Sequence, residues 1–283
     1  MEINDHYIDL ERVLAEKHVS APRWVLKLAE RLLHVKELNA GIYNNRDKKG
    51  LDFVDAFLGD DLRLTVAAKG IENIPETGWP MVVGNHPLGG PDGLALMQAV
   101  GRRRRDVRFP VNDFLMHLPG LKDLFIPIDK VHPHASYAEG LEKAFSGENT
   151  LLYFPAGICS RRIRGKVQDL DWKGTFMKKA VKYQRDVVPV FFDAQNRRRF
   201  YTLANLRRKI GVKFNFEMAL LPGEMFAKRG KEIRLIVGKP IAWQTFDDRH
   251  SPLEWAAKVR GYVYSLKETP ERSFEEWLGE GED

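Results

Sequence analysis

The chain has 283 residues and carries 45 Lys and Arg against 39 Asp and Glu, a formal net charge of +6. Hydrophobic residues make up 43% and aromatic residues 11%, which is typical of a globular protein and excludes a disordered, collagen-like or disulfide-scaffold chain. The single cysteine, Cys159, excludes an internal disulfide and a cysteine-built metal cluster. No apolar run could span a bilayer, and the first residues (MEINDHYIDLER) lack the pattern of a secretory signal. We therefore expect an intracellular protein with a basic surface and an anionic partner.

The first 60 residues have a helical pattern that sets them apart from the rest of the chain. One helix is predicted from Trp24 to Leu38, with an apolar stripe flanked by lysine and arginine, and a second over Leu51–Leu58. The first helix could lie at a membrane interface or pack on the core of its own domain. We expect an N-terminal helical cap of residues 1–60 and an α/β domain of residues 61–283.

In the second part, short apolar runs alternate with helical patterns. This alternation predicts an α/β fold, with a mostly parallel sheet of about seven strands flanked by helices. Strands are expected at Leu62–Ala67, Met81–Gly84, Val107–Val111, Leu124–Ile128, Thr150–Phe154, Val187–Phe192 and Ile233–Val237. Helices are expected at Gly93–Gly101, Ser136–Phe145, Thr175–Tyr183, Ala204–Ile210 and Leu253–Leu266. The acidic tail after Thr269 is expected to end loosely, with Trp277 as the residue able to dock.

The most informative segment is NHPLGGPDG, at 85–93, which follows an apolar strand. Ligands of open α/β sheets bind at the carboxyl ends of strands, where His86 is expected. A neutral imidazole can take a proton from a hydroxyl, and the carboxylate of Asp92 could fix its tautomer. The alternative is structural: Asp92 only caps the next helix, and His86 is an ordinary turn residue.

A second strand leads into FPAGICSRRIRGK, at 154–166. This turn places backbone amides, a hydroxyl and arginine side chains near one another, as in sites for phosphate or carboxylate. A solvated charged loop is the alternative.

Three blocks in this order resemble the signatures of the glycerolipid (lysophospholipid) acyltransferase superfamily: Asn85-His86 with Asp92, Phe154-Pro155-x-Gly157-x-x-Ser160, and Val188-Pro189-Val190. Ile128-Asp129-Lys130 is similar to the remaining block, which usually ends in Ile-Asp-Arg. The likeness covers about residues 62–240, and the helical element before it is similar to that of bacterial members.

The resemblance implies acyl transfer from an acyl thioester, on coenzyme A or acyl carrier protein, to the hydroxyl of a lyso-lipid. His86 would be the general base and Asp92 the residue that orients it, with no metal or prosthetic group required. An enzyme of this class would act from the cytoplasm, peripherally attached to the anionic surface of the cytoplasmic membrane. Turn amides near Gly89, Gly90 or Gly157 would stabilise the oxyanion. Lys130, Ser160, Arg161 and Arg162 would hold the anionic head group of the acceptor, and Asn85 is also expected to contact substrate.

Two departures from the family pattern narrow the range of lipids expected as the acyl acceptor. Five residues, not four, separate His86 from Asp92, as in the branch related to ornithine- and glycine-lipid O-acyltransferases, often labelled haemolysin-like. Ala156 stands where the family has Glu, and Ile158 and Cys159 replace the usual polar pair. A lyso-aminolipid, such as lyso-glycine or lyso-ornithine lipid, is therefore favoured over lysophosphatidic acid or another lysophospholipid, which stays the alternative.

Other features allow different functions. Cys159 could be a nucleophile, although a semi-buried structural thiol is favoured. His117, His132 and His134 could suggest a metal site, but they lack acidic or thiol ligands at helical spacing. The basic runs Arg102–Arg105, Arg197–Arg199 and Arg207–Lys209 would fit a non-catalytic lipid- or nucleic-acid-binding protein. Nucleic acid is not the expected partner, because stacking aromatic residues and a recognisable binding motif are missing.

Overall fold

A computed structural model describes residues 7–16, 20–111, 118–127 and 135–280, and the fold below refers to these ranges. Its centre is a seven-stranded sheet with the order β1-β9-β8-β2-β5-β3-β4. Neighbouring strands run parallel, except for the antiparallel pair of β8 and β9. The strands are β1 Thr65–Lys69, β2 Met81–Gly84, β3 Val107–Val111, β4 Phe125–Pro127, β5 Thr150–Tyr153, β8 Val187–Phe192 and β9 Glu232–Val237. The prediction of a mostly parallel seven-stranded α/β sheet is confirmed.

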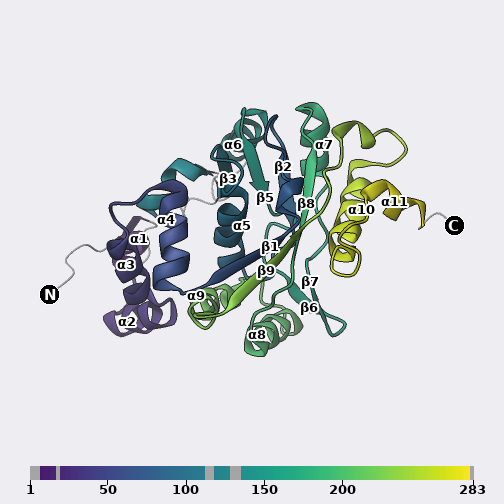
Figure 1. Ribbon diagram of the computed structural model, residues 1–283. Helices are drawn as coiled ribbons and strands as arrows, with labels where there is room; N and C mark the ends of the chain where they lie inside the picture. Colours follow the sequence, from purple (N-terminus) through teal and green to yellow (C-terminus); the bar gives the residue numbers. More distant parts are fainter. Residues whose placement is uncertain (1–6, 17–19, 112–117, 128–134, 281–283) are drawn as a thin grey trace.

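Helices cover both faces of the sheet (Figure 1). They are α5 Pro91–Gly101, α6 Ala135–Ser146, α7 Thr175–Lys182, α8 Arg198–Lys209, α9 Leu221–Phe226, α10 Pro252–Ser265 and α11 Phe274–Gly279. The predicted helix at Ala204–Ile210 is the second half of α8, which begins six residues earlier than expected. The first half was missed because α8 begins with two exposed arginines, Arg198 and Arg199, and its first two turns carry only the adjacent Phe200 and Tyr201 on the buried side, too short a run to show an apolar stripe.

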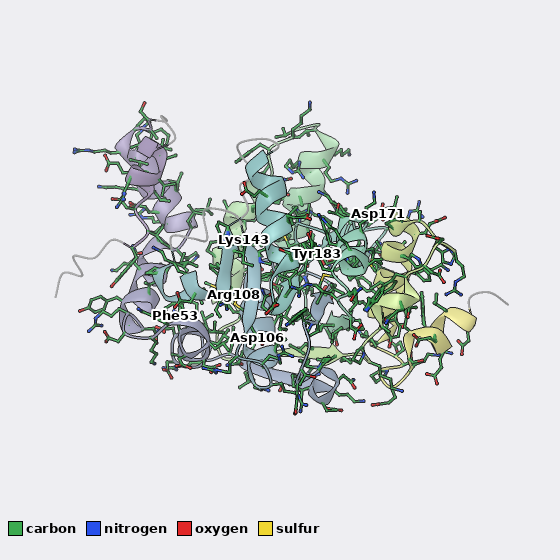
Figure 2. All side chains as sticks on the ribbon, turned by 90° about the horizontal axis from the view of Figure 1, so that it is seen from above. Phe53, Asp106, Arg108, Lys143, Asp171 and Tyr183 are labelled. Carbon is green, nitrogen blue, oxygen red and sulfur yellow. The ribbon has the colours of Figure 1, made fainter. Side chains whose placement is uncertain are left out.

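Successive residues of the central strands point to opposite faces and so divide the core in two. Val82 belongs to a cluster with α5 and the N-terminal helices, whereas Met81 and Val83 belong to a cluster with α6, α7 and α10. Figure 2 labels Phe53 from the first core and Tyr183 from the second. Because both faces are buried, the central strands consist of uninterrupted apolar runs, which is why β2 and β8 have the predicted bounds.

The N-terminal region contains α1 Leu10–Glu16, α2 Arg23–Leu32, α3 Val35–Asn44 and α4 Gly50–Ala56, which continues as a π-helical turn at Phe57–Asp61. The prediction of one helix from Trp24 to Leu38 is wrong. His34 has a left-handed backbone, with φ of 53°, and separates α2 from α3. Its ring lies 5.3 Å from that of Phe226 in α9, so a tertiary contact accompanies the break. These helices share the first core with the sheet, and a division of the chain at residue 60 stays a prediction.

The sequence patterns predicted neither α1 nor α9, and they missed two further features, one after β5 and one near the end of the chain. A hairpin of β6 Arg161–Ile163 and β7 Lys166–Gln168 occupies the basic loop after β5. The tail prediction is wrong, because α11 forms there; Ser273 and Glu276 build a capping box at its start. Trp277 packs against α10, as its predicted docking requires, with its ring 6.0 Å from that of Tyr262. Within the described ranges, no helix is both long and apolar enough to cross a membrane.

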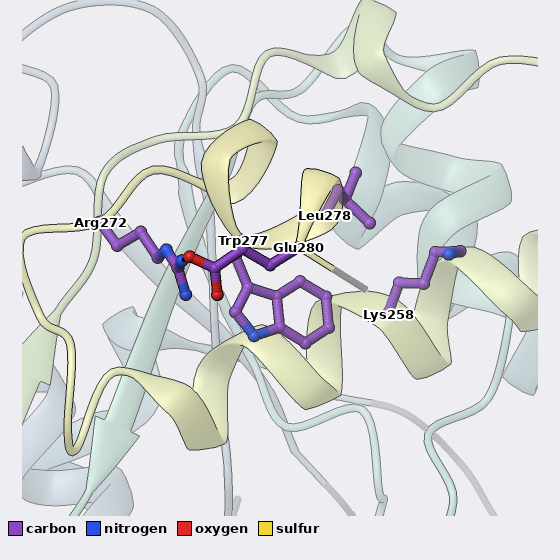
Figure 3. Close-up of a pocket in the computed structure, with 5 residues that line it drawn as sticks. All are labelled: Lys258, Arg272, Trp277, Leu278 and Glu280. Atoms are coloured by element: carbon purple, nitrogen blue, oxygen red, sulfur yellow. Dashed lines mark ion pairs between the residues drawn. The ribbon is translucent and has the colours of Figure 1, made fainter. Parts of the chain in front are cut away.

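A pocket lies between α10 and α11, lined by Lys258, Arg272, Trp277, Leu278 and Glu280 (Figure 3). An ion pair between Arg272 and Glu280 spans one side of it. None of these residues belongs to the motifs at 85–92 and 154–160, which follow the carboxyl ends of β2 and β5.

Candidate active site

His86 and Asp92 are in direct contact at the carboxyl end of β2. His86 follows the last residue of the strand by two positions, and Asp92 is the second residue of α5. The imidazole Nδ1 lies 2.9 Å from Asp92 Oδ2, and Asp92 is completely buried. The extra residue in the turn does not keep the two side chains apart, because Gly89 adopts φ of 86°, a left-handed conformation that glycine allows without strain.

Asp92 is an ionised carboxylate inside the protein. Burial alone would raise its pKa, but the charge and hydrogen bond of His86 and the amides of Leu88 and Gly89 together lower the pKa below its usual value. The two amides donate to Asp92 Oδ2 over 2.8 and 3.2 Å. An ionised partner holds the imidazole proton on Nδ1, so that the lone pair of the neutral ring lies on Nε2. The pair therefore has the chemistry of a general base with its orienting acid.

Packing fixes the position of the imidazole ring as well. The ring of His86 stacks on that of Phe154 with a centroid distance of 4.2 Å and an interplanar angle of 15°. The preceding Asn85 is 3% exposed, and its amide group pairs with the backbone of Phe192 in β8 in both directions, over 3.1 and 2.7 Å. These bonds support a positioning role for Asn85; its predicted contact with substrate stays a prediction.

Asp169, which sequence reasoning missed, joins the two motifs. Its Oδ1 accepts hydrogen bonds from the backbone amide of His86, over 3.1 Å, and from Ser160 Oγ, over 2.6 Å. Trp172 Nε1 donates to its Oδ2 over 2.9 Å. Burial raises the pKa of Asp169, and these hydrogen bonds oppose the rise only in part. The signal in the sequence that could have indicated Asp169 is its position directly after the basic loop and three residues before Trp172.

The predicted head-group residues do not all face one side. Ser160 and Arg161 are each 1% exposed, and the Arg161 guanidinium pairs with Glu217 over 3.0 Å. Arg162 is half-buried, with its guanidinium 5.3 Å from the ring centre of Tyr201. The geometry therefore favours structural roles for Ser160 and Arg161, whereas Arg162 is partly exposed. Lys130 lies outside the described residues.

The three predicted oxyanion glycines differ in the use of their amides. The amide of Gly89 donates to Asp92, and that of Gly157 donates to the carbonyl of Phe154 over 3.0 Å. Among the described hydrogen bonds, none uses the amide of Gly90, which lies exposed at the start of α5. Gly90 is therefore the glycine of the three best able to bind an oxyanion.

Cys159 is placed as a structural thiol. It is completely buried, and burial raises its pKa to about 11, so that thiolate, the nucleophilic form, is scarce near neutral pH. Arg161 Nη1 lies 3.1 Å from the sulfur. His117, His132 and His134 lie outside the described residues. Within the described part, no group of three or more His, Cys, Asp and Glu side chains could hold a metal ion.

Most arginines of the basic runs bind groups of the protein itself. Arg104 pairs with Asp106, the residue directly before β3 and labelled in Figure 2, over 2.7 Å. Its neighbours Arg103 and Arg105 pair with Glu76 and Asp52. Arg197 and Arg199 share the buried carboxylate of Glu224. These runs therefore contribute to the structure, and the sequence pattern alone overstated the free basic surface.

The chain is similar to known acyltransferases. The family model described as Acyltransferase matches residues 12–272. The chain is 42% identical over 265 residues to a lyso-glycine lipid O-acyltransferase of Phocaeicola vulgatus, covering 92% of this chain and 95% of that protein. It is 41% identical to a lyso-glycine lipid O-acyltransferase of Bacteroides thetaiotaomicron, covering 92% and 97%. A solved structure, the 1-acyl-sn-glycerophosphate (LPA) acyltransferase PlsC of Thermotoga maritima, matches with 20% identity and a TM-score of 0.48, covering 77% and 78%.

The family model and the two O-acyltransferase relatives, each matched over most of the chain, define an enzyme that transfers acyl groups. The chain belongs to the acyltransferase family, within the glycerolipid acyltransferase superfamily that its motifs resemble. The predictions of an O-acyltransferase and of a role in lipid biosynthesis are confirmed.

Proposed function

We propose that this enzyme transfers a fatty acyl group from an acyl thioester, on coenzyme A or acyl carrier protein, to the hydroxyl of a lyso-aminolipid. Lyso-glycine lipid is the favoured acceptor, because relatives that share 41–42% of their residues with this chain over 92% of its length carry that name. The five-residue spacing between His86 and Asp92 and the alanine at position 156 support the same acceptor class.

The contact between His86 Nδ1 and the buried carboxylate of Asp92 is the observation that carries the mechanism. The acceptor hydroxyl attacks the thioester carbonyl carbon while His86 Nε2 takes the hydroxyl proton. Asp92 stabilises the imidazolium that forms. When the tetrahedral intermediate collapses, the C–S bond breaks and the imidazolium returns the proton to the leaving thiolate. The step as written uses only the two substrates and groups of the chain.

The negative charge of the tetrahedral intermediate needs hydrogen-bond donors. We assign the amide of Gly90 to this role, because the amides of Gly89 and Gly157 already donate within their turns. A donor at the start of α5 also gains from the partial positive charge of a helix N-terminus. Arg162 and Lys130 stay the proposed partners of the acceptor head group.

A lipid acceptor requires the enzyme to reach a bilayer. We propose that it attaches peripherally to the cytoplasmic face of the membrane, which fits the formal net charge of +6 and the anionic surface of that leaflet. We also propose a division into two domains. Residues 1–60 form a helical cap, and residues 61–283 form the catalytic α/β domain.

The acceptor is tested with purified protein and a panel of detergent-dispersed lyso-lipids. Lyso-glycine lipid, lyso-ornithine lipid and lysophosphatidic acid are each offered with acyl-coenzyme A and with acyl carrier protein, and products are identified by mass spectrometry. We expect an O-acylated aminolipid. Exclusive acylation of lysophosphatidic acid would replace the proposed acceptor, and no consumption of either donor would favour a binding protein.

A further inference from the structure

The second half of α8 and the loop that follows it expose apolar and basic side chains together. Leu206, Ile210 and Phe214 are 52%, 61% and 78% exposed, and Val212 lies between the last two. Residues 208–214 are all exposed. We name Leu206 and residues 208–214 the α8 ridge. Among the described residues, seven of the nine exposed large hydrophobic side chains belong either to this ridge or to α2, so the exposure is concentrated in two places.

The ridge is held in its exposed position by a buried arginine. Arg207 is 8% exposed; its Nε pairs with Glu217 Oε2 over 2.8 Å, and its Nη1 donates to the carbonyl of Val212 over 2.8 Å. The inner face of the same helix is buried, and Phe200 and Tyr201 form a cluster with Cys159. The outer apolar side chains therefore cannot turn inward without breaking the ion pair and this packing.

The ridge belongs to the part of the structure that surrounds His86. Glu217, which fixes Arg207, also pairs with Arg161 of the motif loop over 3.0 Å. Leu221, at the start of α9, lies so close to the turn after His86 that a Cβ on Gly89 would meet it at 2.7 Å. Figure 1 shows α8, α9 and α2 along one edge of the molecule. A surface that binds the ridge would therefore lie near the proposed catalytic pair.

We propose that the α8 ridge docks on the surface of an anionic lipid bilayer. The segment 198–214 contains six lysines and arginines and no acidic residue (RRFYTLANLRRKIGVKF). Exposed Arg208, Lys209 and Lys213 would meet lipid phosphates, while Ile210 and Phe214 enter the boundary with the acyl chains. An anionic membrane interface binds surfaces that combine exposed apolar side chains with basic side chains and carry no acidic ones. The proposal rests on the proposed function, since a lipid acceptor is what gives the docking its purpose.

The test uses the full-length protein and flotation with phosphatidylcholine vesicles that contain or lack phosphatidylglycerol. The first variant, Ile210→Ser/Phe214→Ser, removes the apolar part of the ridge. The second, Lys209→Gln/Lys213→Gln, removes charge from side chains that contribute nothing to the described core. Leu253→Ser is the matched control, because Leu253 is 60% exposed at the start of α10, outside the ridge.

We expect the wild-type protein to float with anionic vesicles and the serine variant to bind at least about tenfold more weakly, because two inserted side chains are lost. The glutamine variant should bind more weakly and depend less on salt. Leu253→Ser should bind like the wild type. All variants should keep their acyl transfer to detergent-dispersed acceptor, which needs no bilayer.

Several outcomes would overturn the proposal. They are a wild-type protein that ignores anionic vesicles, ridge variants that float like the wild type, and a control that loses as much binding as they do. A further outcome would assign the ridge to a second copy of the chain. In it, the wild type is a dimer in sedimentation velocity, the serine variant is a monomer, and both float equally well. Flotation needs no acyl donor, so the two proposals can fail separately. The protein can transfer acyl groups in detergent without binding vesicles, and it can bind vesicles without transferring acyl groups.

Discussion

The backbone amide of His86 donates to Asp169 Oδ1 over 3.1 Å, so the candidate base is held by a carboxylate at its backbone as well as at its ring. The carbonyl of His86 accepts in turn from the amide of Ser160 over 2.7 Å. The loop after β2 and the loop after β5 are thereby joined at the residue that is proposed to move the proton.

Replacing Asp92 with Asn should reduce acyl transfer by about 10³–10⁴-fold, because the charge that orients the imidazole and stabilises its protonated form is lost. The measurement is the turnover rate at saturating acceptor. Circular dichroism spectra that match those of the wild type would show that the loss is chemical. A variant with more than a tenth of the wild-type rate would exclude Asp92 from the mechanism.

Replacing Asp169 with Asn should lower turnover more than it raises KM, because repulsion between the new amide and Trp172 would shift the side chain at position 169, and with it the backbone of His86, while the acceptor site is untouched. The new amide oxygen can accept from His86 and Ser160, but its NH₂ group would then face the indole N–H of Trp172, so that two donors meet. An unpaired buried donor costs about 1–3 kcal/mol of folding stability. An unchanged turnover rate in a folded variant would restrict Asp169 to a structural role.

The two buried carboxylates predict opposite pH dependences of stability. The pKa of Asp92 is lowered in the folded protein, so its contribution is present above its unfolded pKa and is lost as pH falls through the folded value. The pKa of Asp169 is raised, so its contribution is present below its unfolded pKa and is lost as pH rises through the folded value. Urea unfolding of each Asn variant against the wild type, at a series of pH values, measures both. If the difference in unfolding free energy from the wild type followed the same pH trend in both variants, the opposite pKa shifts of Asp92 and Asp169 would be contradicted.

Position 89 favours glycine because its φ is 86°, and a new Cβ would also meet the tip of the Leu221 side chain at 2.7 Å, so that this side chain would have to move. Gly89→Ala should therefore lose activity and about 1–3 kcal/mol of stability. Gly157→Ala is the matched control, since its φ is 71° but no atom lies within 4 Å of the new Cβ. Equal losses in the two variants would show that backbone strain alone matters.

Cys159→Ala should keep acyl transfer within a few-fold of the wild-type rate, because the thiol is buried and its pKa is raised to about 11. Loss of the buried sulfur should cost about 1 kcal/mol or more through the cavity it leaves. Alkylation by iodoacetamide should be slow in the native protein and fast after unfolding. Loss of turnover in a folded variant would return Cys159 to the list of nucleophile candidates.

The sheet was predictable because its central strands are buried on both faces. β2 and β8 are uninterrupted apolar runs, and their bounds were predicted to the residue. The break at His34 was not, because a left-handed residue inside an amphipathic pattern depends on its contact with Phe226, far away in the chain.

The same limit applied to the site. The contact of His86 with Asp92 could be proposed from their spacing along one turn. Asp169 could not, since it reaches the site only through the hairpin of β6 and β7, whose residues have a basic pattern typical of a solvated loop. Arg161 was assigned to the substrate for the same reason: its buried partner, Glu217, lies 56 residues further along the chain.

The central claim is that His86 takes the proton of the acceptor hydroxyl. Its most direct test is acyl transfer from acyl-coenzyme A or acyl carrier protein to detergent-dispersed lyso-glycine lipid by His86→Ala, with acylated product quantified by mass spectrometry. We predict a rate at least about 10³-fold below that of the wild type, in a protein that still unfolds cooperatively. A folded His86→Ala variant that acylates lyso-glycine lipid at the wild-type rate would contradict the account.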